Sequence, residues 1–365
     1  MKTKIVSIVL VITLMMVTVA GCGKKSQSTR GESQGSASAE DGEEAAQASN
    51  EDTAGNTGKG EDDYTIKVGY GGSLCEAPIH IAYEKGFFKD EGINVELIKL
   101  NPGTGFDAIT TGKVDVNFAL LASLVDPLSN GLPAKITTGV HTGCDKVLVK
   151  KNSSIKSAED FKGKKVGVAS YTASPYVFLR RVLADNGVGV TAKNSEVEFV
   201  VYGAADLPLA LENGAVDAIA MNDPTAYIAA NEYGFTTLFD SAMDEPYDKQ
   251  YCCSIYMGNE FIEKHPKLAE KYTIAIQKAS AWVQENQDET ARLQVENKWV
   301  AGKAEENAEV LKTFNYIPSA KGAYDAFEIV ADQMQEIGMV NEDVDVDKLV
   351  TNSFKIFDGI PEEFK

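Results

Sequence analysis

The sequence contains a long stretch without a single large apolar residue. Residues 23–63 carry no Val, Ile, Leu, Met, Phe, Tyr or Trp and consist mainly of Gly, Ser, Ala, Asn, Gln and acidic residues. Such a segment cannot bury enough apolar surface to offset the conformational entropy that folding costs. We therefore predict a disordered acidic tether here and place the start of the folded part near Tyr64.

Basic residues and histidines are also scarce. The 54 Asp and Glu residues outnumber the 35 Lys and Arg residues, and the formal net charge is -19. A chain this acidic lacks the cationic surface that binds phosphate backbones, so we exclude nucleic acid as a partner. The three histidines, His80, His141 and His265, share no metal-ligand spacing. From these residues we predict no catalytic centre and no metal site.

An apolar run begins behind two lysines at the start of the chain. It extends over residues 5–19 and ends in Val19-Ala20-Gly21-Cys22, which resembles the lipobox of bacterial lipoproteins. Its length of about 15 residues falls short of the roughly 20 needed to cross a bilayer, so we predict a signal peptide over residues 1–21 and no membrane span. The resemblance implies lipidation of Cys22, a tether over 22–63, and attachment to the extracytoplasmic face of the cell membrane.

The folded part carries an internal repeat at a spacing of 102 residues. Three segments recur: Val95-Glu96-Leu97 as Val197-Glu198-Phe199, Ala108 as Ala210, and Gly112-Lys113-Val114-Asp115 as Gly214-Ala215-Val216-Asp217. In each half, short apolar strands alternate with helices, a pattern typical of α/β sheets with parallel strands. We therefore predict two similar lobes with a cleft between them, lined by loops from the carboxyl ends of both sheets.

Periodicity and capping residues locate the main elements. We expect strands at residues 66–69 and 165–168, and helices at residues 77–85 and 174–186. Ser157, followed by Glu159 and Asp160, predicts the start of a short helix. Residues 259–312 are expected to be wholly helical, with Trp282 and Trp299 in the core.

The start of the first half resembles a known family. Residues 77–88 read APIHIAYEKGFF and residues 91–96 read EGINVE, and together they are similar to the opening of ABC-importer substrate-binding proteins of the nitrate, sulfonate, taurine and thiamine-pyrimidine-precursor group. Further segments resemble this family in the same order along the chain. They are residues 100–115, 157–167, 170–183 and 211–224.

This resemblance implies a fold and a function. The expected fold is α/β, the two-lobed type II periplasmic-binding-protein fold, in which each lobe is a mostly parallel sheet flanked by helices. Lobe 1 is expected at residues 64–153 and 251–365, and lobe 2 at residues 154–250. The implied function is that of a monomeric, lipid-anchored protein that captures a small solute and delivers it to the permease and ATPase subunits of an ABC importer.

Loops that follow strands at the cleft are the expected binding positions. Strand ends and helix N-termini offer unpaired polar groups, and the family resemblance implies the ligand at the same places. The candidate ligand-binding residues are Cys75, Glu76, Gly103, Thr104, Ser123, His141, Thr142, Tyr171, Thr172, Ser174, Asn222 and Asp223.

One motif among these residues imitates a cofactor site. Gly103-x-Gly105-x-x-Ala108 has the spacing of a dinucleotide fingerprint, but it follows the second strand of its lobe. No acidic residue closes a further strand at the distance that a ribose requires. We therefore expect no nucleotide or other cofactor.

Four cysteines remain after Cys22, and their state is open from the sequence. Cys75 and Cys144 lie in predicted cleft loops, while Cys252 and Cys253 lie where the chain returns from the second lobe. A disulfide would join Cys75 or Cys144 to one of the adjacent pair. The alternatives are a thiolate site for a soft metal and four buried apolar side chains.

The ligand and two rival functions also remain open. Glu76, His141 and Asp223 fall in the predicted loops, where they favour a solute with N–H donors, such as a pyrimidine or another heteroaromatic, over a sulfonate or nitrate. A pyrimidine-precursor-synthesising enzyme of the same fold is one rival, although such an enzyme has no use for Cys22. A ligand-sensing lipoprotein without a transporter is the other.

Overall fold

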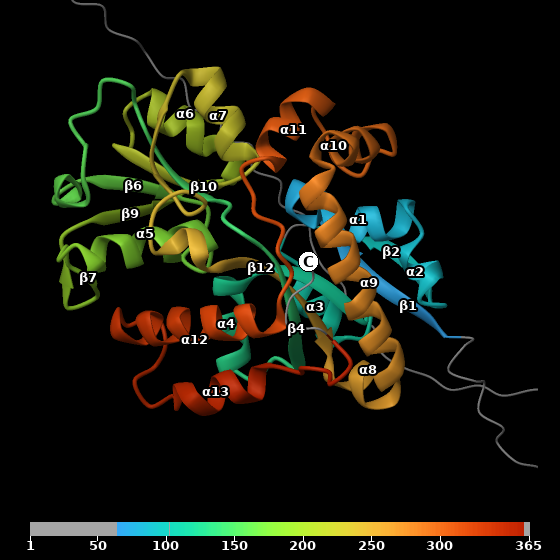
Figure 1. Cartoon of the computed structure of the whole chain (residues 1–365). Helices are drawn as coiled ribbons and strands as arrows, with labels where there is room; N and C mark the ends of the chain where they lie inside the picture. Colours follow the sequence, from blue (N-terminus) through green and yellow to red (C-terminus); the bar gives the residue numbers. More distant parts are fainter. Residues whose placement is uncertain (1–63, 102, 361–365) are drawn as a thin grey trace, which may run out of the picture. The chain divides into compact units, whose positions relative to one another are not determined.

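A computed structural model describes residues 64–101 and 103–360, and the predicted signal peptide and the whole predicted tether, Cys22 included, lie outside them. In this part the chain forms two five-stranded sheets (Figure 1). The first sheet has the order β2-β1-β3-β12-β4, with β1 (Thr65–Tyr70), β2 (Asn94–Lys99), β3 (Val116–Leu120), β4 (Ala134–Thr142) and β12 (Tyr251–Gly258). The second has the order β11-β5-β10-β6-β9, with β5 (Asp145–Val149), β6 (Lys165–Val168), β9 (Glu198–Val201), β10 (Ala218–Asn222) and β11 (Thr236–Asp240).

Each sheet is mostly parallel, as expected, because four of its five strands run in one direction and a single strand runs against them. In the first sheet β1 runs parallel to β2 and β3, whereas β12 runs antiparallel to β3 and β4. In the second, β6 runs parallel to β9 and β10, whereas β5 runs antiparallel to β10 and β11. The antiparallel strands β5 and β12 are the ones that the chain enters from the opposite sheet. They therefore reverse the direction set by the strand–helix–strand units.

The predicted repeat corresponds to equivalent positions in the two sheets. Strands β2 and β9 lie at the edges, each parallel to the first strand of its unit. The Asp115 carboxylate accepts the backbone N–H of Lys67 at 2.8 Å, and the Asp217 carboxylate accepts that of Lys165 at 2.9 Å. The repeated Val-Asp pair therefore ties the start of each lobe's first strand to the turn before its third strand.

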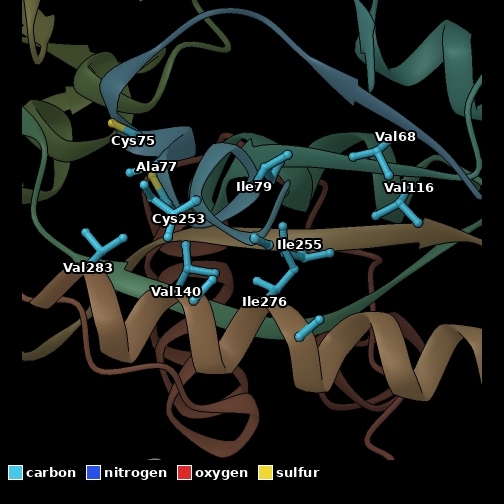
Figure 2. Packing of buried hydrophobic residues seen from close by; sticks show 14 of the residues in the cluster. Val68, Cys75, Ala77, Ile79, Val116, Val140, Cys253, Ile255, Ile276 and Val283 are labelled. Carbon is cyan, nitrogen blue, oxygen red and sulfur yellow. The ribbon is translucent and has the colours of Figure 1, made fainter. Parts of the chain in front are cut away.

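Helices cover both faces of the first sheet, as the alternation of side chains along β12 requires. Cys253, Ile255 and Met257 join the core against α1 (Ala77–Glu84) and α9 (Pro266–Glu285), part of which Figure 2 shows. Tyr256 points to the other face and joins the core with α4 (Leu121–Ser129) and α12 (Ala320–Glu336). This strand is thus buried on both faces in the middle of the first sheet.

The second sheet is built in the same way. Val147 and Val149 of β5 pack on the side of α5 (Ser174–Asp185), and Leu148 packs on the side of α6 (Leu207–Glu212) and α7 (Thr225–Tyr233). Figure 1 shows α6 and α7 on one face of this sheet and α5 on the other. The remaining elements are the helices α2 (Phe87–Asp90), α3 (Gly105–Thr110), α8 (Asn259–Lys264), α10 (Gln287–Glu296), α11 (Ala304–Leu311) and α13 (Val346–Ser353), the hairpin β7 (Val190–Thr191) and β8 (Asn194–Ser195), and short 3-10 turns.

Most sequence-based element predictions agree with the structure. The helix after Ser157 is a 3-10 turn, Ala158–Phe161, with Ser157 and Asp160 forming a capping box. Residues 259–312 are not wholly helical, because the helices stop at His265, at Asn286 and over 297–303. Trp299 is only partly buried, and its indole N–H donates to Glu84 at 2.7 Å. No helix among the described residues has the length and apolar character needed to cross a bilayer.

The turn between β4 and β5 is packed so closely that adding a methyl group at Gly143 should destabilise the protein strongly. Gly143 has φ +67°, and a Cβ there would lie 2.4 Å from Cα of Ala242. Gly131 has a similar φ of +87°, with nothing within 4 Å of its Cβ position, so it serves as the matched control. We expect Gly131→Ala to lower the free energy of unfolding by about 1–2 kcal/mol, and Gly143→Ala by roughly 1–3 kcal/mol more. Urea denaturation measures both, and equal losses would contradict the close packing of the turn.

Candidate functional site

The chain passes from one sheet to the other at two places within residues 103–360, and the two crossings lie together. The first is Gly143-Cys144, between β4 and β5, and the second is residues 241–250, between β11 and β12. The Ser241 hydroxyl accepts the backbone N–H groups of Cys144, at 3.1 Å, and of Asp145, at 2.9 Å. Strand β5 therefore pairs in the second sheet although it precedes residue 154, where the second lobe was expected to begin.

A small cavity lies beside these crossings and draws its walls from both sides. Its volume is about 30 Å³, enough for a water molecule but not for an organic solute. Ala122 of α4 and Val330 of α12 come from helices on the first sheet, and Ser174 and Arg181 come from α5 on the second. The other lining residues are Gly143, Asp145, Phe178, Ser241, Tyr247, Gln250, Tyr251 and Cys252.

Asp145 carries the most unusual chemistry in this cavity. One carboxylate oxygen accepts the Ser174 hydroxyl, while Oδ1 is buried without a hydrogen-bond partner among the described residues. Burial raises the pKa of Asp145 to about 7, and the Ser174 hydrogen bond opposes this only in part. A buried acceptor of this kind is suited to a donor group that enters the cavity.

Lys146, the next residue, is held by two acids on the neighbouring strands. Its ammonium lies 3.0 Å from the Asp223 carboxylate and 2.7 Å from that of Asp240. Desolvation lowers the pKa of Lys146, but the two carboxylates outweigh it and the net shift is upward. Burial raises the pKa of Asp223 to about 6 despite its ion pair. The predicted site residue Asp223 is thus engaged in a buried charge network.

A second pocket lies between α4 and the start of α5. It brings together three predicted residues, Ser123 from α4 and Tyr171 and Thr172 from the loop before α5. Tyr171 is 53% exposed and its hydroxyl donates to the Phe199 carbonyl at 3.2 Å. The remaining lining residues are Ala122, Asp126, Tyr176, Val177, Arg180, Met334 and Met339. Because Ala122 lines both spaces, the pocket and the cavity are neighbours.

Both arginines at these spaces donate to protein oxygens. Arg181 donates to Gln333 at 2.5 Å and to Gln250 at 2.6 Å. Arg180 donates to the carbonyls of Val190 and Ile337, each at 2.6 Å. The bonds to Gln333 and Ile337 join α5 to the end of α12, so these arginines also connect the two sides of the cavity.

Several other predicted residues have local structural roles. The Glu76 carboxylate accepts three backbone N–H groups of its own loop, from residues 71–73, each at 2.7 Å. Thr104 is exposed and donates to the Asn101 carbonyl, and neither it nor Gly103 lines the cavity or the pocket. The Asn222 carbonyl accepts the Thr225 hydroxyl at 2.6 Å. Whether these residues also contact a solute stays a prediction.

The four cysteines and His141 meet in the core at the crossings. All four thiols are free and buried, and Sγ of Cys144 lies 3.8 Å from Sγ of Cys253. Figure 2 places Cys75 and Cys253 at the same end of the apolar cluster. The His141 ring is stacked on Phe314 at a centroid distance of 4.9 Å, and its Nδ1 faces the Thr142 carbonyl at 3.2 Å. Burial raises the pKa of the Cys144 and Cys253 thiols well above the usual value.

The central residue of the cavity, Asp145, was missed by the sequence analysis. The sequence feature that could have identified it is the charged pair Asp145-Lys146, which precedes the apolar residues Val147-Leu148-Val149 in one strand. Charged side chains in a buried strand need partners. Arg181 was missed because it lies inside a helix, where periodicity indicates only a face and not which neighbours it meets.

Comparison of the sequence with models of known protein families gives a match over most of the folded part. A family model described as "NMT1/THI5 like" matches residues 76–290. The chain belongs to the NMT1/THI5-like family. It has the type II periplasmic-binding-protein fold that the sequence resemblance implied.

Three relatives illustrate the range of this family and fold. A protein of Bacillus subtilis (strain 168) named "Putative aliphatic sulfonates-binding protein" is 27% identical over 299 residues, 79% of this chain and 86% of its own length. The 4-amino-5-hydroxymethyl-2-methylpyrimidine phosphate synthase of Aspergillus parasiticus is 26% identical over 235 residues, 61% of this chain and 67% of its own. The crystal structure of the periplasmic aliphatic sulphonate binding protein SsuA from Escherichia coli matches with a TM-score of 0.65 and 19% identity, covering 82% of this chain and 96% of that chain.

The raised pKa of Asp145 predicts how stability depends on pH. Between pH 4 and 7 the folded state holds a proton that the unfolded chain, with a carboxyl pKa of 3.8, has lost. Stability therefore falls as the pH rises through this window. Asp145→Asn removes this titrating group, so its free energy of unfolding should not fall in this way. We expect the free energy of unfolding of the variant, minus that of the wild type, to increase by roughly 2–4 kcal/mol from pH 5 to pH 8.

Asp160→Asn is the matched control for this measurement. Backbone N–H groups of Lys156 and Ser157 lower the pKa of Asp160, so its contribution is complete above pH 5 and is lost only in more acid solution. Urea denaturation at several pH values should give a difference from wild type that is constant between pH 5 and 8. A constant difference for Asp145→Asn as well would mean that the Asp145 carboxyl is not protonated in the folded protein.

Proposed function

We propose that this chain is an extracytoplasmic solute-binding lipoprotein of an ABC importer. It captures a small organic solute between its two sheets and hands it to the permease. The observation that carries the proposal is the cavity at the two crossings, because helices from both sheets line it and it holds a buried, unpartnered acceptor, Oδ1 of Asp145. Family membership and the Bacillus subtilis relative support the same function.

The size of the cavity implies that the sheets separate before a solute enters. At about 30 Å³ the cavity admits water alone, while the neighbouring pocket extends it towards Ser123 and Tyr171. Opening requires the loss of the bonds from Arg180 and Arg181 to the end of α12. Rotation about two adjacent chain crossings is the hinge motion by which two-lobed binding proteins open and close.

The polar groups at the cavity favour a solute that donates hydrogen bonds. Asp145 offers an acceptor, and Tyr171 and Tyr176 offer aromatic faces in the neighbouring pocket. Most donor groups of the nearby cations already have partners, because Arg180 and Arg181 donate to protein oxygens and Lys146 is paired with two acids. Nε of Arg180 has none among the described residues. We propose a heteroaromatic or amine solute over a sulfonate, although the named ligand of the Bacillus subtilis relative supports the sulfonate.

An enzyme function is the second candidate, because the Aspergillus parasiticus relative is a synthase. The two functions differ in what happens to the bound molecule. A binding protein releases its solute chemically unchanged, so mass spectrometry of the solute recovered after prolonged incubation separates them. A changed product would favour the synthase.

Ala122 lines both the cavity and the pocket, so enlarging it should block binding. Ala122→Phe puts an aromatic ring where the solute lies, and we expect the affinity to fall at least about a hundred-fold, which corresponds to roughly 2.7 kcal/mol. Ala215→Phe is the control, because Ala215 is exposed and lies in the turn before β10, at the opposite end of that strand from the crossings.

Thermal-shift screening should first identify a ligand from a panel of heteroaromatic amines, pyrimidines and sulfonates. Calorimetry then measures both variants. Wild-type affinity in Ala122→Phe would contradict the proposed site, and stabilisation by sulfonates alone would contradict the proposed solute class.

Membrane attachment should depend on Cys22. Because the lipobox-like Val19-Ala20-Gly21-Cys22 provides one acceptor for the lipid, we expect Cys22→Ser to release the protein from membranes that retain the wild type. Cell fractionation with immunoblotting measures this, with Ser26→Ala in the tether as a control. Retention of a processed Cys22→Ser chain on the membrane would mean that something other than the lipid holds it.

A further inference from the structure

We propose that Cys75, Cys144, Cys253 and His141 form a binding site for a thiophilic d¹⁰ metal ion of the Zn²⁺ type, buried where the chain crosses between the sheets. This site goes beyond solute binding and does not depend on which solute is bound. Cys75 comes from the turn after β1, His141 from the end of β4, Cys144 from the first crossing, and Cys253 from β12 after the second crossing.

Two of the donor atoms already lie at the distance that a tetrahedral metal site needs, and the others lie near them. In a tetrahedral site with Zn–S bonds of about 2.3 Å, two sulfur ligands lie about 3.8 Å apart. Sγ of Cys144 and Sγ of Cys253 are 3.8 Å apart. Ligand atoms of Cys75, His141 and Cys253 all lie within 4.8 Å of one another, and so do those of Cys144, Cys252 and Cys253. Small side-chain rotations would then bring three sulfurs and one nitrogen to the corners of a tetrahedron.

The state of His141 favours a metal site over a cluster of thiols that binds nothing. The residue is fully buried, and its Nδ1 faces the Thr142 carbonyl, which makes Nδ1 the protonated nitrogen. Nε2 then carries the lone pair, and it has no hydrogen-bond partner among the described residues. A ring fixed by a backbone carbonyl on one nitrogen, with the other nitrogen free, is the arrangement found for histidines that bind metal. A disulfide would leave this nitrogen unexplained.

Binding would proceed with a defined balance of protons. Cys75, Cys144 and Cys253 are free thiols, so three S–H bonds break and three protons leave to solvent as three metal–sulfur bonds form. His141 binds as the neutral imidazole. Nothing is oxidised or reduced in this step.

The position of the site suggests what the ion does. It would bond the turn after β1 to both crossings, and Sγ of Cys75 already lies 3.9 Å from the Asp223 carbonyl of the second sheet. A bound ion would therefore hold the two crossings together while the sheets rotate about them. We expect it to raise the thermal stability of the chain.

Metal titration of the full chain tests this proposal directly. The protein is purified under reducing conditions, freed of metal with a chelator, and titrated with Zn²⁺ in competition with a chromophoric chelator. Co²⁺ serves as the spectroscopic probe, since thiolate ligands give it a charge-transfer band and tetrahedral geometry gives it intense visible bands. We expect one ion per chain and both Co²⁺ signatures.

Variants identify the ligands. Cys253→Ser and His141→Ala should each weaken Zn²⁺ binding by about a hundred-fold or more. His265→Ala is the matched control, because this histidine is stacked on Tyr64 away from the thiols, and it should bind within a few fold of wild type.

A measurement on the wild-type chain tests the proposal even if the variants fail to fold. Zn²⁺ should slow alkylation of Cys75, Cys144 and Cys253, located by mass spectrometry. Three results would overturn the proposal: no stoichiometric Zn²⁺ binding to the reduced chain, equal binding by His141→Ala and wild type, or a disulfide among these cysteines in protein isolated without reductant.

Discussion

The two connections between the sheets must pass through one place, and the Ser241 hydroxyl joins them there by accepting the amides of Cys144 and Asp145. Because of this contact, the end of β4, the start of β5 and the approach to β12 are held together. The cavity, the buried Lys146 network and the thiol cluster all lie on these segments. Their relative positions follow from the register of β12 against β4 and of β5 against β10.

The cost of this arrangement is that polar groups are buried at the centre of the molecule. Lys146 is stabilised there by Asp223 and Asp240, but Asp145 has only the Ser174 hydroxyl for one of its two oxygens. A buried carboxylate with an unpartnered oxygen destabilises the folded state when ionised, and such groups cluster at functional sites. The unpartnered oxygen of Asp145 therefore lowers the stability of the unliganded protein and also favours the binding of a hydrogen-bond donor in the cavity.

The fold could be predicted well from the sequence because it depends on local patterns that repeat along the chain. The Val-Asp pairs at 115 and 217 recur with the same hydrogen bond in both sheets. Site residues were harder, because a polar residue after a strand can bind its own loop, as Glu76 does, as readily as a ligand. Asp145 was not predicted because its role depends on Ser174 and Ser241, which only the folded chain brings to it. The sequence left the state of the cysteines open, and tertiary structure alone brings Cys75 and Cys144 to the adjacent pair Cys252-Cys253.

We propose that the two sheets close on a solute by rotating about the paired crossings. Small-angle X-ray scattering on the purified protein, with and without a saturating ligand found by thermal shift, tests it most directly. We expect a smaller radius of gyration in the bound state, and a return to the larger value when the ligand is removed. An unchanged radius of gyration with a ligand that calorimetry shows to be bound would contradict it.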